Sequence, residues 1–262
     1  MLELYQTVNS VCAQKIRIAL AEKGLDYAER NISLNGDQYK PEYLKLNPNA
    51  VVPTLIHDGQ PVIESSVILY YLEDAFPMPS LMPPGPRDRA RVRLYNKLID
   101  EYVHPGCAIL TFATAFRKRS LAMSDDDYKA GIAGMVYRKF IDYKLSVREK
   151  GIESEYVIEA LKSHDKMLTW MEEALEQAPY IAGSSYSLAE AAVIPYILRL
   201  ELIKLDRMWA KRPRVAEWWE RIRARPSTVA AIFDRMGPAD YAPFESYTDD
   251  PWPKAQAILE AV

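Results

Sequence analysis

Two serine hydroxyls stand at the starts of helices that the sequence predicts. Ser10 lies directly before the helical pattern of residues 12–23, and Ser65 opens a second helix directly after Glu64. A serine in such a place caps its helix, because the hydroxyl accepts a hydrogen bond from a backbone N–H of the first turn. The same end of a helix carries partial positive charge and favours anions. Local sequence alone therefore predicts two caps, each where an anion would be stabilised.

Composition limits the class of protein. The 262 residues include 33 Lys and Arg against 36 Asp and Glu, a formal net charge of −3, whereas nucleic-acid-binding proteins usually need a basic face. No apolar run approaches the length of a membrane span, and the first residues do not form a signal peptide. Cys12 and Cys107 allow at most one disulfide. We expect a soluble, cytoplasmic protein with no nucleic-acid or membrane partner and no metal.

Prolines divide the chain. Five of the 18 prolines lie between Pro77 and Pro86, and no helix tolerates that spacing. Before them the pattern predicts strands at residues 2–5 and 27–32, a hairpin over 51–64, and helices at 12–23 and 65–74. Gly24 fits the left-handed end of the first helix, and Asp58-Gly59 fits a hairpin turn. The order β-α-β, then β-β-α, predicts a small sheet with helices packed on it.

Helical periodicity dominates after the prolines. We expect a long helix over residues 87–116, a helix capped by Ser124, a helix over 155–175, a capping box at 187–190 and a last helix over 214–224. These patterns predict an α/β domain in residues 1–76, a linker in 77–86, an all-helical domain in 87–236 and a tail in 237–262. The tail either folds over a pocket mouth or is weakly ordered.

Several short motifs, in this order and spacing, resemble those of the cytosolic glutathione transferases. The resemblance covers roughly the first 235 residues, and it rests on Asn9-Ser10-Val11-Cys12, Leu46-Asn47-Pro48, Val52-Pro53 and Glu64-Ser65. It implies a thioredoxin-like N-terminal domain, an all-α helical-bundle C-terminal domain, glutathione as co-substrate and a homodimer. A finer likeness, to bacterial glutathione-dependent β-aryl etherases of lignin breakdown, rests on residues 64–68, 71–77, 100–102 and Met123-Ser124-Asp125-Asp126.

The resemblance implies that a donor near the first helix stabilises the glutathione thiolate. A free thiol has a pKa of about 8.5, and lowering it by about 2 units requires about 2.7 kcal/mol of preferential stabilisation. A hydrogen bond to the anion contributes about 1.5–3 kcal/mol and the helix dipole about 0.3–1 kcal/mol. Ser10 is the first candidate donor, and the register of other serine-type classes points to Asn9. Ser10 as a simple cap remains an alternative.

Cys12 carries two interpretations of its own. In omega-like members of the family, a cysteine near this position forms a mixed disulfide with glutathione. Near the start of the predicted helix, a cysteine is more often a small buried side chain. Both interpretations stay open at this point.

The resemblance also assigns contacts to the rest of glutathione. The extended backbone at Val52 and a cis Pro53 would bind its cysteinyl main chain; an ordinary edge-strand proline is the plain alternative. Glu64 would pair with the γ-glutamyl amino group, while Ser65 and its helix N-terminus would accept the carboxylate. Without the family, Ser65 is only an N-cap.

The glycyl end departs from the family pattern. The family often places Lys or Gln where this chain has Val51, so Gln38 and Lys40 are the candidates for that contact. This departure puts the affinity for glutathione in doubt, though not the fold.

The second substrate is expected against the first long helix of the helical domain. Its candidate residues are Tyr102, His104, Ala108, Thr111, Phe112 and Ala115. A lone histidine such as His104 is more often structural than catalytic. The many tyrosines of this domain suit an aromatic ligand, although helical cores also use them.

Three functions follow as hypotheses. The first is a glutathione transferase that attacks an electrophilic carbon of an aromatic molecule, with cleavage of a lignin-derived β-aryl ether as its sharper form. The second keeps the fold but reduces a disulfide or peroxide with glutathione. The third is a ligand-binding protein without catalysis.

Overall fold

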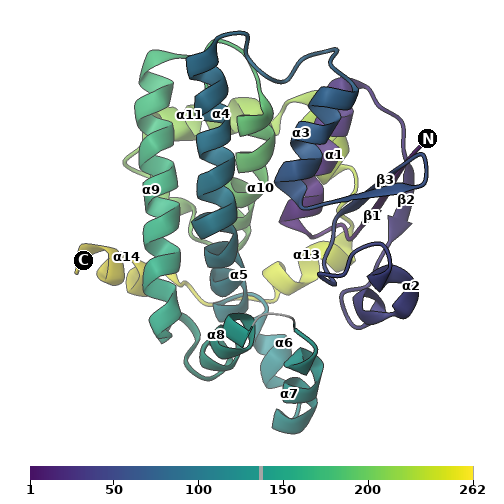
Figure 1. Cartoon of the computed structure of the whole chain (residues 1–262). Coiled ribbons are helices and arrows are strands. Elements are labelled where there is room, and N and C mark those ends of the chain that lie inside the picture. The colour runs from purple at the N-terminus through teal and green to yellow at the C-terminus, as the bar shows by residue number, and fades with distance from the viewer. Residues whose placement is uncertain (136–137, 262) are drawn as a thin grey trace. The chain divides into compact units, whose positions relative to one another are not determined.

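The computed structural model describes residues 1–135 and 138–261. Figure 1 shows the whole chain, coloured from purple at the N-terminus to yellow at the C-terminus. The chain forms two compact units, each assembled from three segments. The first comprises Met1–Asn96, Ala178–Pro195 and Glu220–Asp240, and the second Lys97–Gln177, Tyr196–Trp219 and Tyr241–Val262. The domains predicted above are continuous ranges of residues, unlike these units, and their boundaries stay a prediction. No helix in the described part of the chain is both long enough and apolar enough to cross a bilayer.

The first unit contains a four-stranded sheet of order β2-β1-β3-β4. Strand β1 is parallel to β2 and antiparallel to β3, which is antiparallel to β4. Asp58 and Gly59 join the last two strands with φ angles of 48° and 81°, the left-handed pair that a tight hairpin needs. The predicted strands and turn are confirmed. The strands are β1 (Leu2–Gln6), β2 (Ala28–Asn31), β3 (Thr54–His57) and β4 (Gln60–Ile63).

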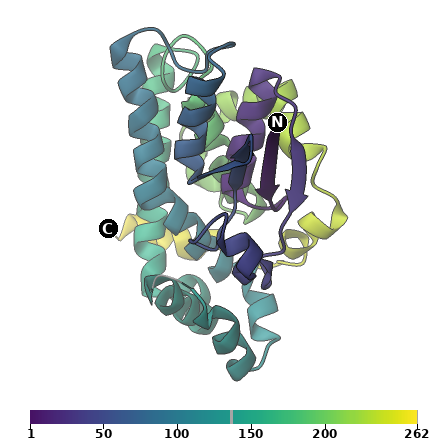
Figure 2. The same ribbon diagram turned by 45° about the vertical axis from the view of Figure 1, so that its right-hand side comes forward.

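Helices α1 (Val11–Lys23) and α3 (Ser65–Ala75) pack against each other. Both lie on the same side of the sheet in the two views of Figures 1 and 2. Helix α1 ends as predicted, because Gly24 has a φ of 62° and forms the left-handed cap. The order β-α-β followed by β-β-α is the thioredoxin-like arrangement that the sequence predicted. Two short elements, η1 (Asp37–Tyr39) and α2 (Pro41–Leu44), come between β2 and β3.

A buried ion pair holds the proline-rich stretch in the first unit. The ammonium of Lys23 lies 2.7 Å from the Glu73 carboxylate and donates to two backbone carbonyls near the start of the stretch, at 2.7 and 3.0 Å. Glu73 also accepts from the Ser80 hydroxyl at 2.5 Å and the Leu81 N–H at 2.9 Å. The stretch ends at α4 (Pro86–Leu98), whose first position tolerates proline because its N–H would have no helical partner.

Two later segments complete the first unit. The predicted capping box is confirmed: the Ser187 N–H donates to the Glu190 carboxylate at 3.0 Å, and the Ser187 hydroxyl accepts an N–H of the first turn at 3.2 Å. It opens α10 (Leu188–Leu202). Segment η5 (Val229–Phe233) packs on α1, where the Arg17 guanidinium donates to a carbonyl of η5 at 2.7 Å.

The second unit is built from helices. The long helix predicted over residues 87–116 is present as one uninterrupted helical run that ends at Ala113. It differs from the prediction in that α4 passes through a π-helical turn, η2 (Ile99–Val103), into α5 (His104–Ala113). Pro105 has no N–H for the carbonyl four residues before it, which accounts for the wide turn there. The remaining helices of the chain are α6 (Arg117–Leu121), α7 (Asp125–Ala133), α8 (Arg138–Lys150), η3 (Gly151–Glu153), α9 (Glu155–Gln177), η4 (Asp206–Trp209), α11 (Pro213–Arg223), α12 (Pro226–Thr228), α13 (Pro238–Glu245) and α14 (Trp252–Glu260).

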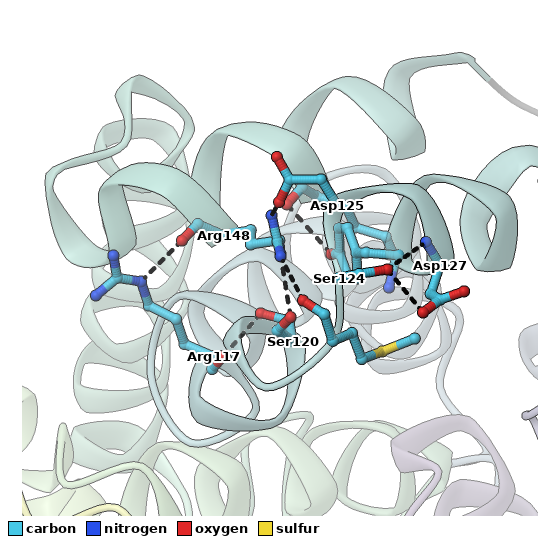
Figure 3. Close-up of polar contacts among 9 residues, drawn as sticks. Arg117, Ser120, Ser124, Asp125, Asp127 and Arg148 are labelled. Carbon is cyan, nitrogen blue, oxygen red and sulfur yellow. Dashed lines mark hydrogen bonds and ion pairs between the residues drawn. The ribbon is translucent and has the colours of Figure 1, made fainter.

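Arg148 joins α8 to the α6–α7 region, as Figure 3 shows. Its guanidinium lies 2.6 Å from the Asp125 carboxylate and donates to the carbonyls of Ser120 at 3.1 Å and Met123 at 2.9 Å. The Ser124 hydroxyl accepts a first-turn N–H of α7 at 3.1 Å, so the predicted cap is confirmed. The Met-Ser-Asp motif of the sequence thus anchors α7 and α8 to each other.

Candidate functional site

Ser10 is the N-cap of α1. Its backbone is extended, with φ −74° and ψ 117°, and its hydroxyl accepts a hydrogen bond from the Ala13 N–H at 3.3 Å. The predicted cap is therefore present. A hydroxyl that accepts through a lone pair keeps its own proton for donation, and Ser10 is half-buried rather than enclosed. Capping and donation to an anion are compatible at this residue.

Asn9 points toward the end of the first unit. Its amide nitrogen donates to the Asp240 carbonyl at 3.0 Å and lies 3.4 Å from the Asp240 carboxylate. The observed contacts of the amide thus tie residues 9 and 240 together.

Neither cysteine forms a disulfide. Cys12 is half-buried in the first turn of α1, and Cys107 is buried in α5. The structural interpretation of Cys12 expected a buried side chain, whereas the side chain is only half-buried.

The Val52-Pro53 pair lies directly before β3, and its peptide bond is cis, as the resemblance implied. Tyr43 and Asn47 fix the preceding residue, since both donate to the Val51 carbonyl, at 2.6 and 2.9 Å. The N–H and the carbonyl of Val52 form no hydrogen bond with any residue that the structure describes. Its side chain is buried. The backbone of Val52 is therefore held in place while both of its polar groups stay available.

Glu64 and Ser65 form the start of α3. Glu64 is the N-cap residue and has a left-handed φ of 69°, a conformation that non-glycine residues adopt mainly where the surroundings enforce it. Its exposed carboxylate accepts from the Asn49 amide at 2.8 Å. Ser65 is the first helical residue, so its interpretation as the N-cap is wrong by one position. Its hydroxyl accepts from a lysine instead of capping the helix.

That lysine is Lys15, which the sequence interpretation missed. Its side chain lies within α1 with none of its surface exposed, and its ammonium is 3.0 Å from both the Ser65 and the Ser66 hydroxyl oxygens. The apolar residues four positions to either side, Val11 and Ala19, are the signal that could have placed it on a buried face. The buried ammonium of Lys15 thus contacts the first two residues of α3.

The two glycyl-end candidates differ in their surroundings. Gln38 is buried and folds its own loop, since its amide donates to the Leu34 carbonyl at 3.1 Å and accepts from the Gly36 N–H at 2.9 Å. Lys40 is exposed and pairs with Asp37 at 2.7 Å. Of the two side chains, Lys40 is the one that stands in solvent.

The six candidates for the second substrate lie in the second unit, on η2, on α5 and just beyond α5. Tyr102 is 57% exposed and lines a cavity of about 400 Å³ with Leu98, Pro105, Ile109 and residues of α9. None of the other five candidates lines that cavity. The structure thus separates Tyr102 from Phe112 and its neighbours.

The other five candidates have distinct partners. The His104 Nδ1 and the Tyr196 hydroxyl are 3.2 Å apart, and Thr111 donates to the Cys107 carbonyl at 2.7 Å. Phe112 is half-buried, Ala108 is half-buried and Ala115 is buried. Phe112 begins a series of rings that the sequence did not reveal: its centroid is 5.5 Å from that of Phe116, which lies 5.6 Å from that of Phe244.

Models of one protein family match both halves of the sequence. Residues 9–75 match the N-terminal domain of the glutathione S-transferases, and residues 136–226 match their C-terminal domain. Glutathione is accordingly the co-substrate of this chain.

Individual relatives extend the match over most of the sequence. Protein LigF of Sphingobium sp. strain SYK-6 is 30% identical over 246 residues, which cover 89% of this chain and 93% of LigF. The maleylacetoacetate isomerase of Mus musculus is 41% identical over 105 residues, which cover 39% of this chain and 49% of the isomerase.

A solved structure agrees with these matches. The crystal structure of beta-etherase LigF superposes with a TM-score of 0.79 at 28% identity, and it covers 90% of this chain and 99% of LigF. The thioredoxin-like sheet and the helical second part predicted from the sequence are those of this neighbour. The chain belongs to the glutathione S-transferase family.

Proposed function

We propose that this protein stabilises the thiolate of glutathione at Ser10 for attack on an electrophilic carbon of an aromatic substrate. The observation that carries the proposal is the Ser10 hydroxyl at the N-terminus of α1, which accepts the Ala13 N–H and keeps its own proton to donate. The hydroxyl and the positive end of a 13-residue helix then act on one sulfur. Ser10 is preferred to Asn9, because the Asn9 amide is directed at Asp240.

The first unit also offers groups for the peptide part of glutathione. Val52 presents an N–H and a carbonyl that no described residue uses, which suits the main chain of the cysteinyl residue. The start of α3 presents helix N–H groups together with the Ser65 hydroxyl, which suits the γ-glutamyl carboxylate. The exposed Glu64 carboxylate suits the amino group. For the glycyl carboxylate we retain Lys40 as the charged candidate and Gln38 as the second.

We propose β-aryl ether cleavage as the specific reaction, on the strength of the likeness to LigF over nearly the full length of both chains. The thiolate attacks the carbon that bears the aryl ether, a C–S bond forms, and the C–O bond breaks. The oxygen leaves with the bonding electron pair as a phenolate, and a proton then converts it to the phenol. Phenols have a pKa near 10, so the phenolate is a tolerable leaving group.

A second candidate is glutathione-dependent isomerisation. It is favoured by the 41% identity with the mouse maleylacetoacetate isomerase. That match covers 39% of this chain, whereas the LigF match covers nearly all of it, so etherase chemistry is placed first.

We further propose that the protein is a homodimer, as the resemblance to the family implied. Light scattering of the purified protein should give twice the mass of one chain. The mass of one chain at micromolar concentration would contradict the dimer without touching the proposed chemistry.

The function is tested by incubating the purified protein and glutathione with four substrates in separate reactions: a β-aryl ether dimer, maleylacetoacetate, a mixed disulfide and a generic electrophile such as a halogenated nitrobenzene. We expect release of the phenol and formation of a glutathione thioether with the dimer. Turnover of maleylacetoacetate alone would select the isomerase, and turnover of the disulfide alone would select the reductase. If the protein turned over none of these substrates and did not bind glutathione, the proposal that it is an enzyme would be contradicted.

A further inference from the structure

A tight turn between β1 and α1 carries Ser10. The Ser10 N–H donates to the Thr7 carbonyl at 3.1 Å and closes the turn. Val8 and Asn9 occupy its two central positions. Such a turn has one backbone hydrogen bond of its own, so its conformation depends on groups that reach it from elsewhere. The direction of the Ser10 hydroxyl therefore depends on what holds this turn.

Both central residues of the turn are held from the segment of the first unit that follows α12. The Val8 carbonyl accepts from the Arg17 guanidinium at 2.9 Å, and the same guanidinium donates to the Ala231 carbonyl at 2.7 Å. The Asn9 amide donates to the Asp240 carbonyl at 3.0 Å. Residues more than 200 positions later in the chain thus hold the turn before α1.

Arg17 is the side chain that joins these parts. It lies on α1, seven residues after Ser10, with 1% of its surface exposed. Its remaining nitrogen donates to the side-chain oxygen of Gln6, the last residue of β1. Burial lowers the pKa of Arg17 to about 10, so the group stays charged at neutral pH. One planar guanidinium with fixed donor directions thus fixes the end of β1, the turn and η5 relative to one another.

We propose that Arg17 is a positioning residue for the reaction: by holding the Val8 carbonyl against η5, it sets the direction in which the Ser10 hydroxyl donates to the sulfur of glutathione. This inference rests on the proposed function. A hydrogen bond weakens as its angle departs from linear, and a displacement of about 1 Å at a reacting centre can cost about 100-fold in rate. Each nitrogen of Arg17 already serves an acceptor of the protein, so the residue acts through the turn.

The test titrates the thiol of bound glutathione in Arg17→Met and measures turnover of a halogenated nitrobenzene. The thiol pKa should rise by roughly 1 unit, about half of the shift expected from Ser10 and its helix. The value of kcat should fall by roughly 10- to 100-fold. KM for glutathione should stay nearly unchanged, because Val52 and Ser65 lie on other segments. A wild-type thiol pKa with glutathione bound would overturn the proposal.

Arg17→Lys separates geometry from charge. It keeps a buried positive charge, but a lysine has one nitrogen where the arginine has three in a plane. We expect the thiol pKa to rise in this variant as well. A wild-type thiol pKa in Arg17→Lys would show that the charge alone is sufficient, and it would overturn the positioning role. This variant also carries the test if Arg17→Met fails to fold.

A double variant shows whether Arg17 acts through Ser10. In the Ser10→Ala background, Arg17→Met should cause no further rise of the thiol pKa, because the hydroxyl that it positions is already absent. Two changes that act through one group are not additive in this way. Additive rises of the thiol pKa would mean that Arg17 acts on the sulfur by another route, and they would overturn the proposal.

Arg225→Met is the matched control. Arg225 also joins α1 to the later segment, since its guanidinium donates to the Glu22 carboxylate at 2.8 Å. Glu22 lies at the end of α1 away from Ser10. We expect the control to lower stability and to leave the thiol pKa and kcat unchanged. If Arg225→Met raised the thiol pKa as much as Arg17→Met, the effect would belong to a general loosening of α1 and the positioning role would be refuted.

Hydrogen exchange separates this inference from the proposed function. The Ser10 amide closes the turn, so its exchange rate in the protein without glutathione reports opening of the turn. Arg17→Met should raise this rate roughly tenfold, and Arg225→Met should not. An unchanged rate in Arg17→Met would overturn the inference and leave the proposed function standing. An unchanged thiol pKa in Ser10→Ala would contradict the proposed function, while hydrogen exchange would still decide whether Arg17 holds the turn.

Discussion

At the starts of helices α1 and α3, the contacts of one serine hydroxyl determine whether it caps the helix, can donate to a ligand, or does both. At α1 the Ser10 hydroxyl accepts from the helix and retains a proton to donate. At α3 the Ser65 hydroxyl accepts from Lys15, which also contacts Ser66. Because the lysine occupies a lone pair of each hydroxyl, their protons are directed elsewhere. Lys15 thus acts as a positioning residue for the start of α3.

Replacing Lys15 by Met is expected to weaken glutathione binding roughly tenfold, because one hydrogen bond to a charged group and the orientation of Ser65 are lost together. Calorimetry would measure the dissociation constant for glutathione and for an analogue that lacks the γ-glutamyl α-carboxylate. The analogue should bind both proteins equally. Ser66→Ala, which leaves Ser65 and Lys15 in place, is the control and should lose less.

The outcome that contradicts this role is an equal loss for both ligands. It would mean that Lys15 supports the fold of the first unit and does not act through the carboxylate. An unchanged affinity for glutathione would contradict it as well.

Lys15 also illustrates which features of the first unit could be predicted from the sequence and which could not. Hydroxyls before helices, a turn dipeptide and a capping box follow from local geometry, so Ser10, Asp58-Gly59 and Ser187 could be predicted. The partners of Lys15 and Arg17 could not, since these polar residues of α1 are covered by α3 and by η5, and the sequence does not show which segment covers which part of the helix. Those partners are distant in sequence. The burial of Lys144 on α8 could not be predicted for the same reason, because it depends on α5.

Elements of the first unit are joined by few, strong contacts. The Lys23–Glu73 pair links the end of α1 to the end of α3 and to the proline-rich stretch. Prolines cannot form a regular ladder of hydrogen bonds, so this stretch depends on side chains that reach it. The sequence pattern predicted the helices and the proline-rich stretch that follows α3, but it did not predict the ion pair that holds this stretch in place.

Lys23→Met is expected to lower the free energy of unfolding by about 3–5 kcal/mol, the usual cost of leaving one partner of a buried pair uncompensated. Denaturant unfolding followed by circular dichroism would measure it. Adding Glu73→Gln to Lys23→Met removes the stranded charge and should recover part of the loss. A single-variant loss below about 1 kcal/mol, typical of a surface pair, would show that the pair does not hold the stretch.

At the scale of the whole molecule, the buried ammonium of Lys144 on α8, with 7% of its surface exposed, makes stability depend on pH. Burial lowers the pKa of Lys144 to about 8 from the ordinary 10.5. The unfolded chain therefore binds more protons between pH 8 and 10.5, and this group makes stability rise with pH in that window. Below pH 8 the full cost of the buried charge is present; above pH 10.5 it is absent.

Lys144→Met should accordingly be more stable than the wild type by about 3 kcal/mol at pH 7, since each pKa unit corresponds to 1.36 kcal/mol. The difference should decline through pH 8 to 10.5. Denaturant unfolding of both proteins across this range gives the measurement, with Lys139→Met, which removes an exposed lysine of the same helix, as the reference. A variant less stable than the wild type at pH 7 would show that Lys144 supports the fold rather than straining it.

The central claim for the whole molecule is that Ser10 stabilises the glutathione thiolate. The most direct test titrates the ultraviolet absorbance of the thiolate of bound glutathione in the wild type and in Ser10→Ala, with Ser10→Asp as the variant that keeps a helix cap but adds a negative charge. We expect a thiol pKa about 2 units below the free value of about 8.5 in the wild type, and a return toward the free value in both variants, although Ser10→Asp keeps the stability of α1. An unchanged thiol pKa in Ser10→Ala, with glutathione still bound, would show that Ser10 does not stabilise the thiolate.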